Sequence, residues 1–227
     1  DLETNILYNN GLNIRQREYL DNTSYKDEWF LHMQKDYTLM YIGYSVGDSL
    51  MPPIVSAVDS ALQTQAKMNG YGYTSLSKNE LLVHLSSTSI FSCITHGLSS
   101  SIGTSDGTLT INDINSLNNT AFNNLKFVYF GACLTGSGRS GGTNLVNTVY
   151  NKGADTVLGF TIEVFVSETN LWTQSFMTNL ATGVSINSAM NTADITVRND
   201  PGIDVPFYST SSTNRYLAGS AELIPCR

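Results

Sequence analysis

The stretch from Leu125 to Gly136, LKFVYFGACLTG, decides the fold that the sequence predicts. Its apolar run is short, is rich in β-branched and aromatic residues, and ends in small residues, which is typical of a strand buried in a parallel sheet. The chain then turns at Gly131, Ala132 and Cys133. Because α/β sheets place their reactive groups at the carboxyl ends of their strands, Cys133 occupies the position of such a group.

A second stretch of the same kind lies earlier in the chain. Residues Ser89 to Thr95, SIFSCIT, are uncharged and mostly apolar, and His96 and Gly97 follow them directly. If the two strands are neighbours in a parallel sheet, they present His96 and Cys133 at the same edge. A cysteine and a histidine brought together from strand ends are the minimum for a cysteine nucleophile with an acid/base partner.

The rest of the chain alternates between strand and helix patterns. Strands are predicted at residues 38–44 (TLMYIGY), 156–161 and 216–223, and a short edge strand at residues 108–111. Helices are predicted to run from Pro52-Pro53 to Asn69-Gly70, to begin after a capping box at Ser77 to Glu80, and to cover residues 144–152, 163–180 and 185–197. Segments 98–107 and 135–143 are predicted to be glycine-rich loops, the second the more flexible. This alternation predicts an α/β fold, a three-layer α/β/α sandwich with a mostly parallel sheet.

The composition excludes several classes of function. The 227 residues carry a formal net charge of −7, and the 12 Lys and Arg residues do not cluster, so binding to a nucleic acid is not expected. No run approaches the ~20 apolar residues that span a membrane. The three cysteines, Cys93, Cys133 and Cys226, are irregularly spaced, which argues against a disulfide framework or a zinc site. We therefore expect no membrane span, no metal and no cofactor.

The chain is expected to hold one large domain with a short attachment. Residues 1–37 lack a clear periodicity and are predicted to be an amino-terminal extension or the remnant of a preceding domain, while residues 38–227 form the main domain. Because the sequence begins at Asp1 and not at Met, we expect a processed product or an excised domain. Sparse charge with abundant Ser, Thr, Asn and Gly favours a secreted or cell-surface bacterial protein.

These motifs resemble the signature of the clan CD cysteine peptidases, which include caspases, metacaspases, legumains, gingipains and separases. In that signature one hydrophobic strand ends in His-Gly and a second ends in a small residue, Ala and Cys, as at residues 96–97 and 131–133. Within the clan, the chain is most similar in pattern to the CHAT-domain proteases. Residues 107–114 (GTLTINDI), 132–138 (ACLTGSG) and 152–159 (KGADTVLG) carry that similarity, which covers about residues 38–195.

The resemblance implies a caspase-like peptidase domain over residues 38–227, and a cysteine endopeptidase acting on a peptide or protein substrate. Cys133 would attack the peptide carbonyl and form a thioester, and His96 would protonate the leaving amine and then activate water. The resemblance places the oxyanion hole at the backbone N–H groups of Gly97 and Cys133. Glycine suits this role because its lack of a side chain lets the backbone approach the substrate oxygen. The resemblance allows for an activating partner or domain.

The sequence indicates the substrate preference less clearly than it indicates the catalytic residues. Gly131 stands two residues before the cysteine, where metacaspases have Asp and caspases have Gln, and the resemblance implies that this position shapes the pocket for the residue before the cut. Asp48 and Glu163 follow two predicted strands and could supply negative charge, which favours Arg or Lys before the cut. The alternative is that both acids cap the helices that follow them. Arg139 is a candidate site of self-cleavage, unless its loop binds substrate instead.

The same residues allow other interpretations. Cys133 alone could be a small buried residue and His96 a structural histidine, but their joint occurrence at matched strand ends favours catalysis. Residues 43–47 (GYSVG) fit the G-x-S-x-G motif of serine hydrolases, yet no histidine follows His96, and too few residues precede Ser45 to supply the earlier strands of that fold. The domain could also be an inactive caspase-like scaffold that binds partners. Cys93 is predicted to lie in the core, Cys226 to be exposed or unpaired, and His32 and His84 to have structural roles.

Overall fold

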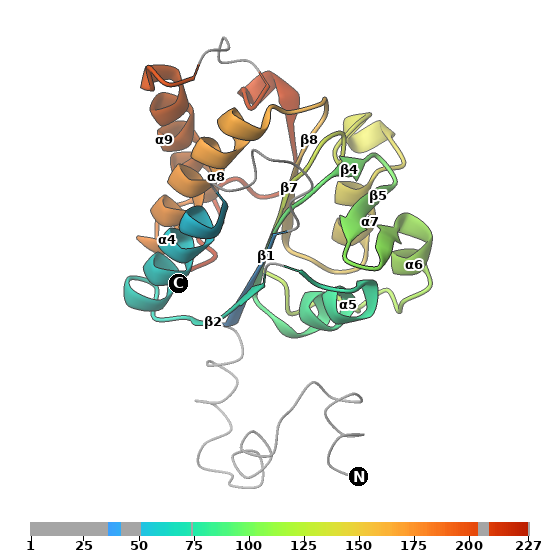
Figure 1. The fold of residues 1–227 in the computed structure, drawn as a ribbon. Helices are drawn as coiled ribbons and strands as arrows, with labels where there is room; N and C mark the ends of the chain where they lie inside the picture. Colours follow the sequence, from blue (N-terminus) through green and yellow to red (C-terminus); the bar gives the residue numbers. More distant parts are fainter. Residues whose placement is uncertain (1–35, 42–50, 74, 204–208, 227) are drawn as a thin grey trace, which may run out of the picture.

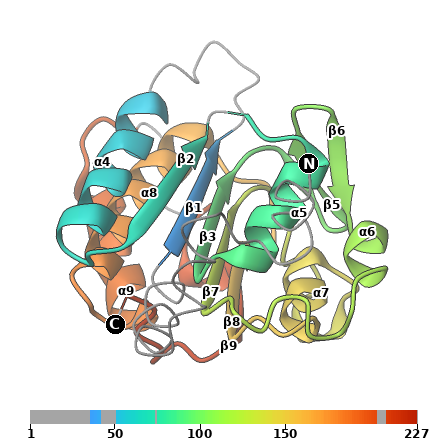
Figure 2. The ribbon, with the colours of Figure 1, turned by 90° about the horizontal axis from the view of Figure 1, so that it is seen from below.

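A mostly parallel sheet forms the centre of the molecule in the computed structural model, which describes residues 36–41, 51–73, 75–203 and 209–226. Its strands lie in the order β2 (Asn69–Tyr73), β1 (Asp36–Tyr41), β3 (Ile90–Ile94), β7 (Phe127–Gly131), β8 (Thr156–Phe160) and β9 (Arg215–Gly219), as Figure 2 shows. The first five are parallel, and β9 runs antiparallel to β8. Every residue of β7 and β8 is buried, which explains why neither segment carries a charged residue.

Helices cover both faces of this sheet (Figure 1). One face carries α4 (Met51–Thr64), α8 (Val166–Ala181) and α9 (Ile186–Asn199), and the other carries α5 (Lys78–Ser87), α6 (Ile111–Asn115) and α7 (Leu145–Asn151). Each face has its own buried apolar cluster. On the α8 side the rings of Tyr129, Trp172 and Phe176 pack together, with 4.7 Å between the centroids of the last two. The predicted three-layer α/β/α sandwich is confirmed.

Local signals in the sequence fix where several helices begin. α5 follows the predicted capping box, in which the Ser77 side chain accepts from the Glu80 N–H and the Glu80 carboxylate accepts from the Ser77 N–H at 2.8 Å. α6 begins with a second capping box, formed by Thr110 and Asp113. Asn144 caps α7 by accepting a hydrogen bond of 2.8 Å from the backbone N–H three residues later. These caps set the points at which the chain leaves and rejoins the sheet.

The segment 98–107, predicted to be a loop, contains most of a second sheet. β4 (Gly97–Leu98), β5 (Ser101–Thr104) and β6 (Gly107–Thr110) form a three-stranded antiparallel sheet beside α5 and α6. Ile102 and Leu109 are its buried apolar side chains. The prediction was wrong because strands of two to four residues are too short to show an alternating pattern, and the turns that join them supplied the polar residues.

Several boundaries differ from those predicted. Asn69 and Gly70 begin β2 instead of ending a helix, and α8 begins at Val166 instead of at residue 163. β1 begins at Asp36, two residues before the predicted start of the main domain. Residues 1–35 and 42–50, and with them the predictions for His32, Ser45 and Asp48, lie outside the described residues. Within the described part of the chain, no helix combines the length and the apolar character needed to cross a membrane.

The glycine-rich segment 135–143, predicted to be a flexible loop, is a turn held by side-chain hydrogen bonds. It contains a short 3₁₀ helix, η3 (Arg139–Gly141). The side-chain amide of Asn144 donates to the carbonyl oxygens of Ser137 and Arg139 at 2.9 and 2.8 Å. The Arg139 guanidinium donates to the Thr213 carbonyl oxygen. Gly138 has a φ of 76°, so its lack of a side chain serves the left-handed backbone of the turn.

Candidate active site

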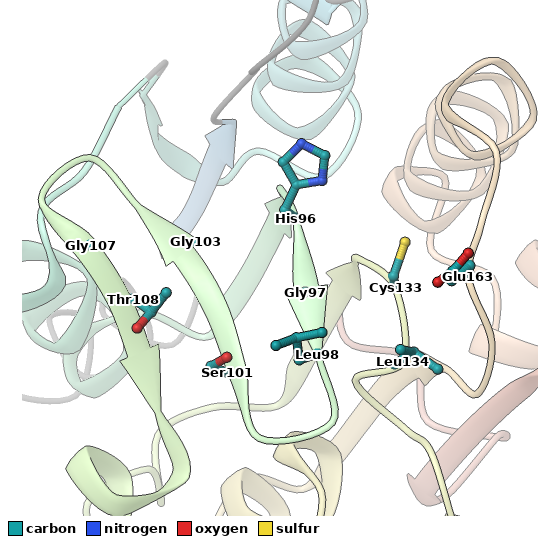
Figure 3. A pocket seen from close by; sticks show the side chains of 10 residues that line it. All are labelled: His96, Gly97, Leu98, Ser101, Gly103, Gly107, Thr108, Cys133, Leu134 and Glu163. Carbon is teal, nitrogen blue, oxygen red and sulfur yellow. The ribbon is translucent and has the colours of Figure 1, made fainter.

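The register of two central strands determines where His96 and Cys133 lie. β3 and β7 are parallel neighbours, and Ile94 at the end of β3 pairs with Gly131 at the end of β7. His96 and Cys133 each follow that pair by two residues, so both stand at the carboxyl edge of the sheet. The structure places the two side chains on one pocket, as Figure 3 shows.

The backbone of His96 is held by β5. The Gly103 N–H donates to the His96 carbonyl oxygen at 2.9 Å, while the imidazole is exposed to solvent. Antiparallel ladders alternate bonded and unbonded pairs, so the bond to Gly103 makes Gly97 and Ile102 an unbonded pair. The N–H of Gly97 is therefore directed away from β5. Cys133 lies on that side of β4 (Figure 3).

Gly97 packs directly against the loop that carries the cysteine. A Cβ at this position would lie 2.8 Å from the Ala132 Cβ and 2.8 Å from the Cys133 carbonyl oxygen. Both distances are shorter than van der Waals contact, so a larger residue would displace the Cys133 backbone. The glycine after the histidine is required by this close approach, whatever further role its N–H has.

The cysteine side chain is partly buried and accepts a hydrogen bond. The Val164 N–H donates to Cys133 Sγ at 3.4 Å, and such a donor stabilises negative charge on sulfur. The next residue, Leu134, has a φ of 62°, which is uncommon for any residue other than glycine and is often found at functional sites. Its N–H donates to the Ile162 carbonyl oxygen at 3.0 Å. The loop after β7 is thus joined to the loop after β8, and both orient the thiol.

An open pocket of about 510 Å³ surrounds these residues. Its lining consists of His96, Gly97, Leu98, Ser101, Gly103, Gly107, Thr108, Cys133, Leu134 and Glu163 (Figure 3). The sheet β4–β5–β6 forms one half, and the loops after β7 and β8 form the other. Glu163 is the one carboxylate among these ten residues. No group of His, Cys, Asp and Glu side chains in the described ranges could hold a metal ion.

The residues predicted to bind substrate have different positions. Glu163 lines the pocket from the loop before α8, and the N-cap of that helix is Phe165, so the alternative that Glu163 caps the helix is wrong. Gly131 is buried at the end of β7, where a Cβ would lie 3.1 Å from the Ile94 side chain, and it is not one of the lining residues. Asp48 lies outside the described residues. The roles of Gly131 and Asp48 stay predictions from the sequence.

Cys93, Cys226 and His84 do not line this pocket. Cys93 is fully buried in β3, and burial raises the pKa of its thiol. Cys226 is a free, partly buried cysteine, and burial raises the pKa of its thiol to about 12. The Nδ1 atom of His84 lies 3.2 Å from Thr38 Oγ1, and burial lowers the pKa of the imidazole. Cys133 is the cysteine that lines the pocket.

A buried carboxylate supports the loop after β8 from behind. Glu168, in the first turn of α8, is 0% exposed. Its carboxylate accepts from the Ser209 hydroxyl, and from the N–H and the hydroxyl of Thr210 at 2.9 and 2.8 Å. The Ser209 hydroxyl oxygen accepts in turn from the Phe165 N–H at 3.4 Å. Phe165 follows the residue that donates to the cysteine thiol, so this network fixes the backbone beside the thiol.

Sequence reasoning missed the role of Glu168 and most of the β4–β5–β6 half of the pocket, of which it predicted only the short edge strand at residues 108–111. The strands β4 and β5 carry no pattern long enough to detect. An acid three residues into a helix is typical of an exposed first turn, where it interacts with the helix dipole. Glu168 is instead buried by a segment that lies 41 residues further along the chain, and nothing local to it indicates this.

Comparison with known families gives one match. The CHAT domain family model matches residues 58–216, which is more than half of the 227 residues. No curated protein sequence matches the chain.

The solved structures with a similar fold include cysteine proteinases and related proteins. Gingipain R, an Arg-specific cysteine proteinase, is similar with a TM-score of 0.69 at 11% identity, over 86% of this chain and 48% of its own. Separase of Saccharomyces cerevisiae, in its complex with securin, is similar with a TM-score of 0.54 at 13% identity, over 82% of this chain and 12% of the separase chain. Caspase-1 of Spodoptera frugiperda is similar with a TM-score of 0.53 at 12% identity, over 84% of this chain and 90% of the caspase chain. This chain spans about half of gingipain R, and at these identities the similarity establishes the fold.

Proposed function

The chain belongs to the CHAT domain family and has the caspase-like fold of the clan CD cysteine peptidases, and from this we propose that it is a cysteine endopeptidase. The observation that carries the proposal is the position of His96 and Cys133, at equal distances beyond two paired strand ends and on one pocket. A thiol and an imidazole so placed fit nucleophilic attack on a peptide carbonyl with proton transfer to the leaving group.

In the proposed reaction, Cys133 Sγ attacks the carbonyl carbon of the scissile peptide while the thiol proton passes to His96. The C–N bond then breaks, His96 gives the proton to the leaving amine, and the acyl group stays on sulfur as a thioester. His96 next takes a proton from a water molecule that attacks the thioester. The C–S bond breaks, the proton returns to the sulfur, and the product leaves as a carboxylic acid.

The negative charge that develops on the substrate oxygen would be stabilised by the N–H groups of Gly97 and Cys133. The direction of the Gly97 N–H, away from β5 and toward the cysteine side of β4, supports this part of the proposal. Gly97 is fixed on one side by β5 and on another by the Cys133 backbone. Donors held in place before the reaction need no rearrangement as the charge appears, which is the main source of their effect.

The residue before the cut is proposed to be Arg or Lys. The support is Glu163, an exposed carboxylate that lines the pocket beside the cysteine loop (Figure 3). A carboxylate pairs well with a guanidinium through two parallel hydrogen bonds, and with an ammonium through one. The other lining residues, apart from His96, carry no charge.

The experiment that tests the peptidase is hydrolysis of a mixed peptide library, with the released ends sequenced by mass spectrometry. We expect wild type to cleave and Cys133→Ala to be slower by at least about 10³-fold, because the nucleophile is removed. Cys226→Ser is the matched control, since it removes a thiol that does not line the pocket and should leave cleavage unchanged. Equal cleavage by wild type and Cys133→Ala would contradict the proposal.

The same library tests the basic preference. Glu163→Gln should lower the preference for Arg and Lys before the cut by about tenfold, because the charge is lost and the shape is kept. Glu222→Gln, which changes an exposed glutamate outside the pocket, should have no effect. If no protein cleaves any peptide and no electrophilic peptide labels Cys133, the inactive scaffold is the better interpretation.

A further inference from the structure

An exposed leucine stands at one end of the proposed active site. Leu98 at the end of β4 is 57% exposed and lines the pocket. A single exposed leucine on a protein surface needs no explanation. This one belongs to a concave surface whose other members on the same side are Ser101, Gly103, Gly107 and Thr108, which are small and uncharged (Figure 3). The pocket therefore has two unlike halves, one with Glu163 and one without charge.

The backbone around Leu98 holds the side chain in this position. Leu98 pairs with Ser101 across the turn between β4 and β5. The two residues of that turn are attached to the helices behind it: the Leu145 N–H donates to the Ser99 carbonyl oxygen at 2.8 Å, and the Ile111 N–H donates to the Ser100 carbonyl oxygen at 2.9 Å. Because this turn is held from both sides, the backbone of Leu98 is fixed at the edge of the pocket.

The chemistry of the proposed reaction gives the direction in which a substrate lies, and this step rests on the proposed function. The acyl carbon is bonded to Cys133 Sγ, and the leaving amine must reach His96 to receive its proton. His96 directly precedes β4, between the cysteine and the strands β5 and β6 (Figure 3). The residues after the cut therefore leave over the β4–β5–β6 sheet, and the residue before the cut lies on the Glu163 side.

We propose that Leu98, together with Ser101 and Thr108 of the adjoining strands, forms the subsite for the residue immediately after the cut, and that this subsite selects an uncharged, apolar side chain. Such a side chain removes the Leu98 surface and its own from water, which is favourable. A charged side chain would lose hydration in the same place without a partner, because no lining residue in this half carries a charge. The substrate class is thus a peptide with an apolar residue after the cut.

The test is a set of internally quenched peptides with one fixed basic residue before the cut and Leu, Met, Gly, Lys or Glu after it. For wild type we expect kcat/KM to be about tenfold higher with Leu or Met than with Lys or Glu. Leu98→Glu should reverse the order between Leu and Lys, because it places a carboxylate in this half of the pocket. Ile195→Glu is the matched control: Ile195 is 58% exposed on α9, on the opposite face of the sheet, and its substitution should leave the order unchanged.

Three results would overturn the inference. One is a Leu98→Glu variant that cleaves with the wild-type order of preference. Another is a Leu98→Glu variant that changes the preference before the cut, which would reverse the direction assigned to the substrate. The third is a wild-type protein that cleaves none of the peptides and is not labelled at Cys133 by an electrophilic peptide, which would overturn the proposed function as well. Glu163→Gln separates the two proposals, because it should change the preference before the cut and leave the preference after it.

Discussion

Replacement of Glu168 by alanine should destabilise the protein strongly, although no prediction from the sequence gave this residue a role. The carboxylate accepts three hydrogen bonds, from the Ser209 hydroxyl and from the Thr210 N–H and hydroxyl, and all three residues are 0% exposed. Each buried donor left without an acceptor costs roughly 1–3 kcal/mol. The gain from no longer burying a charge offsets part of that sum. We therefore expect the free energy of unfolding to fall by about 3–5 kcal/mol.

The assay is equilibrium unfolding in urea followed by circular dichroism, on wild type, Glu168→Gln and Glu168→Ala. The glutamine keeps the shape and one acceptor oxygen, but it turns an NH₂ toward the Ser209 hydroxyl, so its cost should be about 1–3 kcal/mol. Against a total stability of about 5–15 kcal/mol, the order of wild type, glutamine and alanine should be clear. Glu222→Ala is the matched control, because Glu222 is exposed and its removal should change little.

A Glu168→Ala variant within about 1 kcal/mol of wild type would refute this reasoning, since it would mean that water replaces the carboxylate without penalty. A glutamine variant less stable than the alanine variant would also refute it, because both variants lose the charge and only the glutamine keeps an acceptor oxygen for the buried donors.

Three further predictions follow from single contacts. Gly97→Ala should lower kcat/KM by about 10²-fold, because the new Cβ would lie 2.8 Å from the Cys133 carbonyl oxygen and displace the nucleophile. Gly141→Ala is the matched control: its Cβ would meet nothing within 4 Å, so kcat/KM should stay at the wild-type value. Because burial lowers the pKa of His84, the unfolded chain takes up a proton before the folded chain does as the pH falls below the usual 6.5. The stability of the folded protein should therefore decrease below that pH. In thermal unfolding between pH 7.5 and 5.5, the unfolding temperature of His84→Asn should depend less on pH than that of wild type. An equal pH dependence in the two proteins would contradict a role for this imidazole. Asn144→Ala should lower the free energy of unfolding by about 1 kcal/mol, because a helix cap is lost. It should also make the turn at residues 137–142 more susceptible to cleavage by added trypsin, because the amide that holds this turn is removed. Equal resistance of the two proteins to trypsin would mean that the turn does not need this amide.

The sequence by itself determined the central strands and the candidate nucleophile. Residues 89–95 and 127–131 carry no charge and are mostly apolar because both faces of these strands are covered, so the segment itself indicates its burial. The same holds for the capping box at Ser77, which joins groups three residues apart. Small residues and a Cys or His after such a run indicate a strand end with a reactive group, which is why Cys133 and His96 could be selected.

Only the tertiary structure decided how these segments meet. The pairing of Ile94 with Gly131 sets the positions of His96 and Cys133 relative to each other, and no local pattern encodes that register. The pocket half around Leu98 is built from strands too short to detect, and Glu168 is buried by a segment far along the chain. The physical reason is the same in each case. A sequence pattern reports whether a segment will be buried, whereas the partner that buries it is chosen by packing and hydrogen bonds between residues distant in the chain.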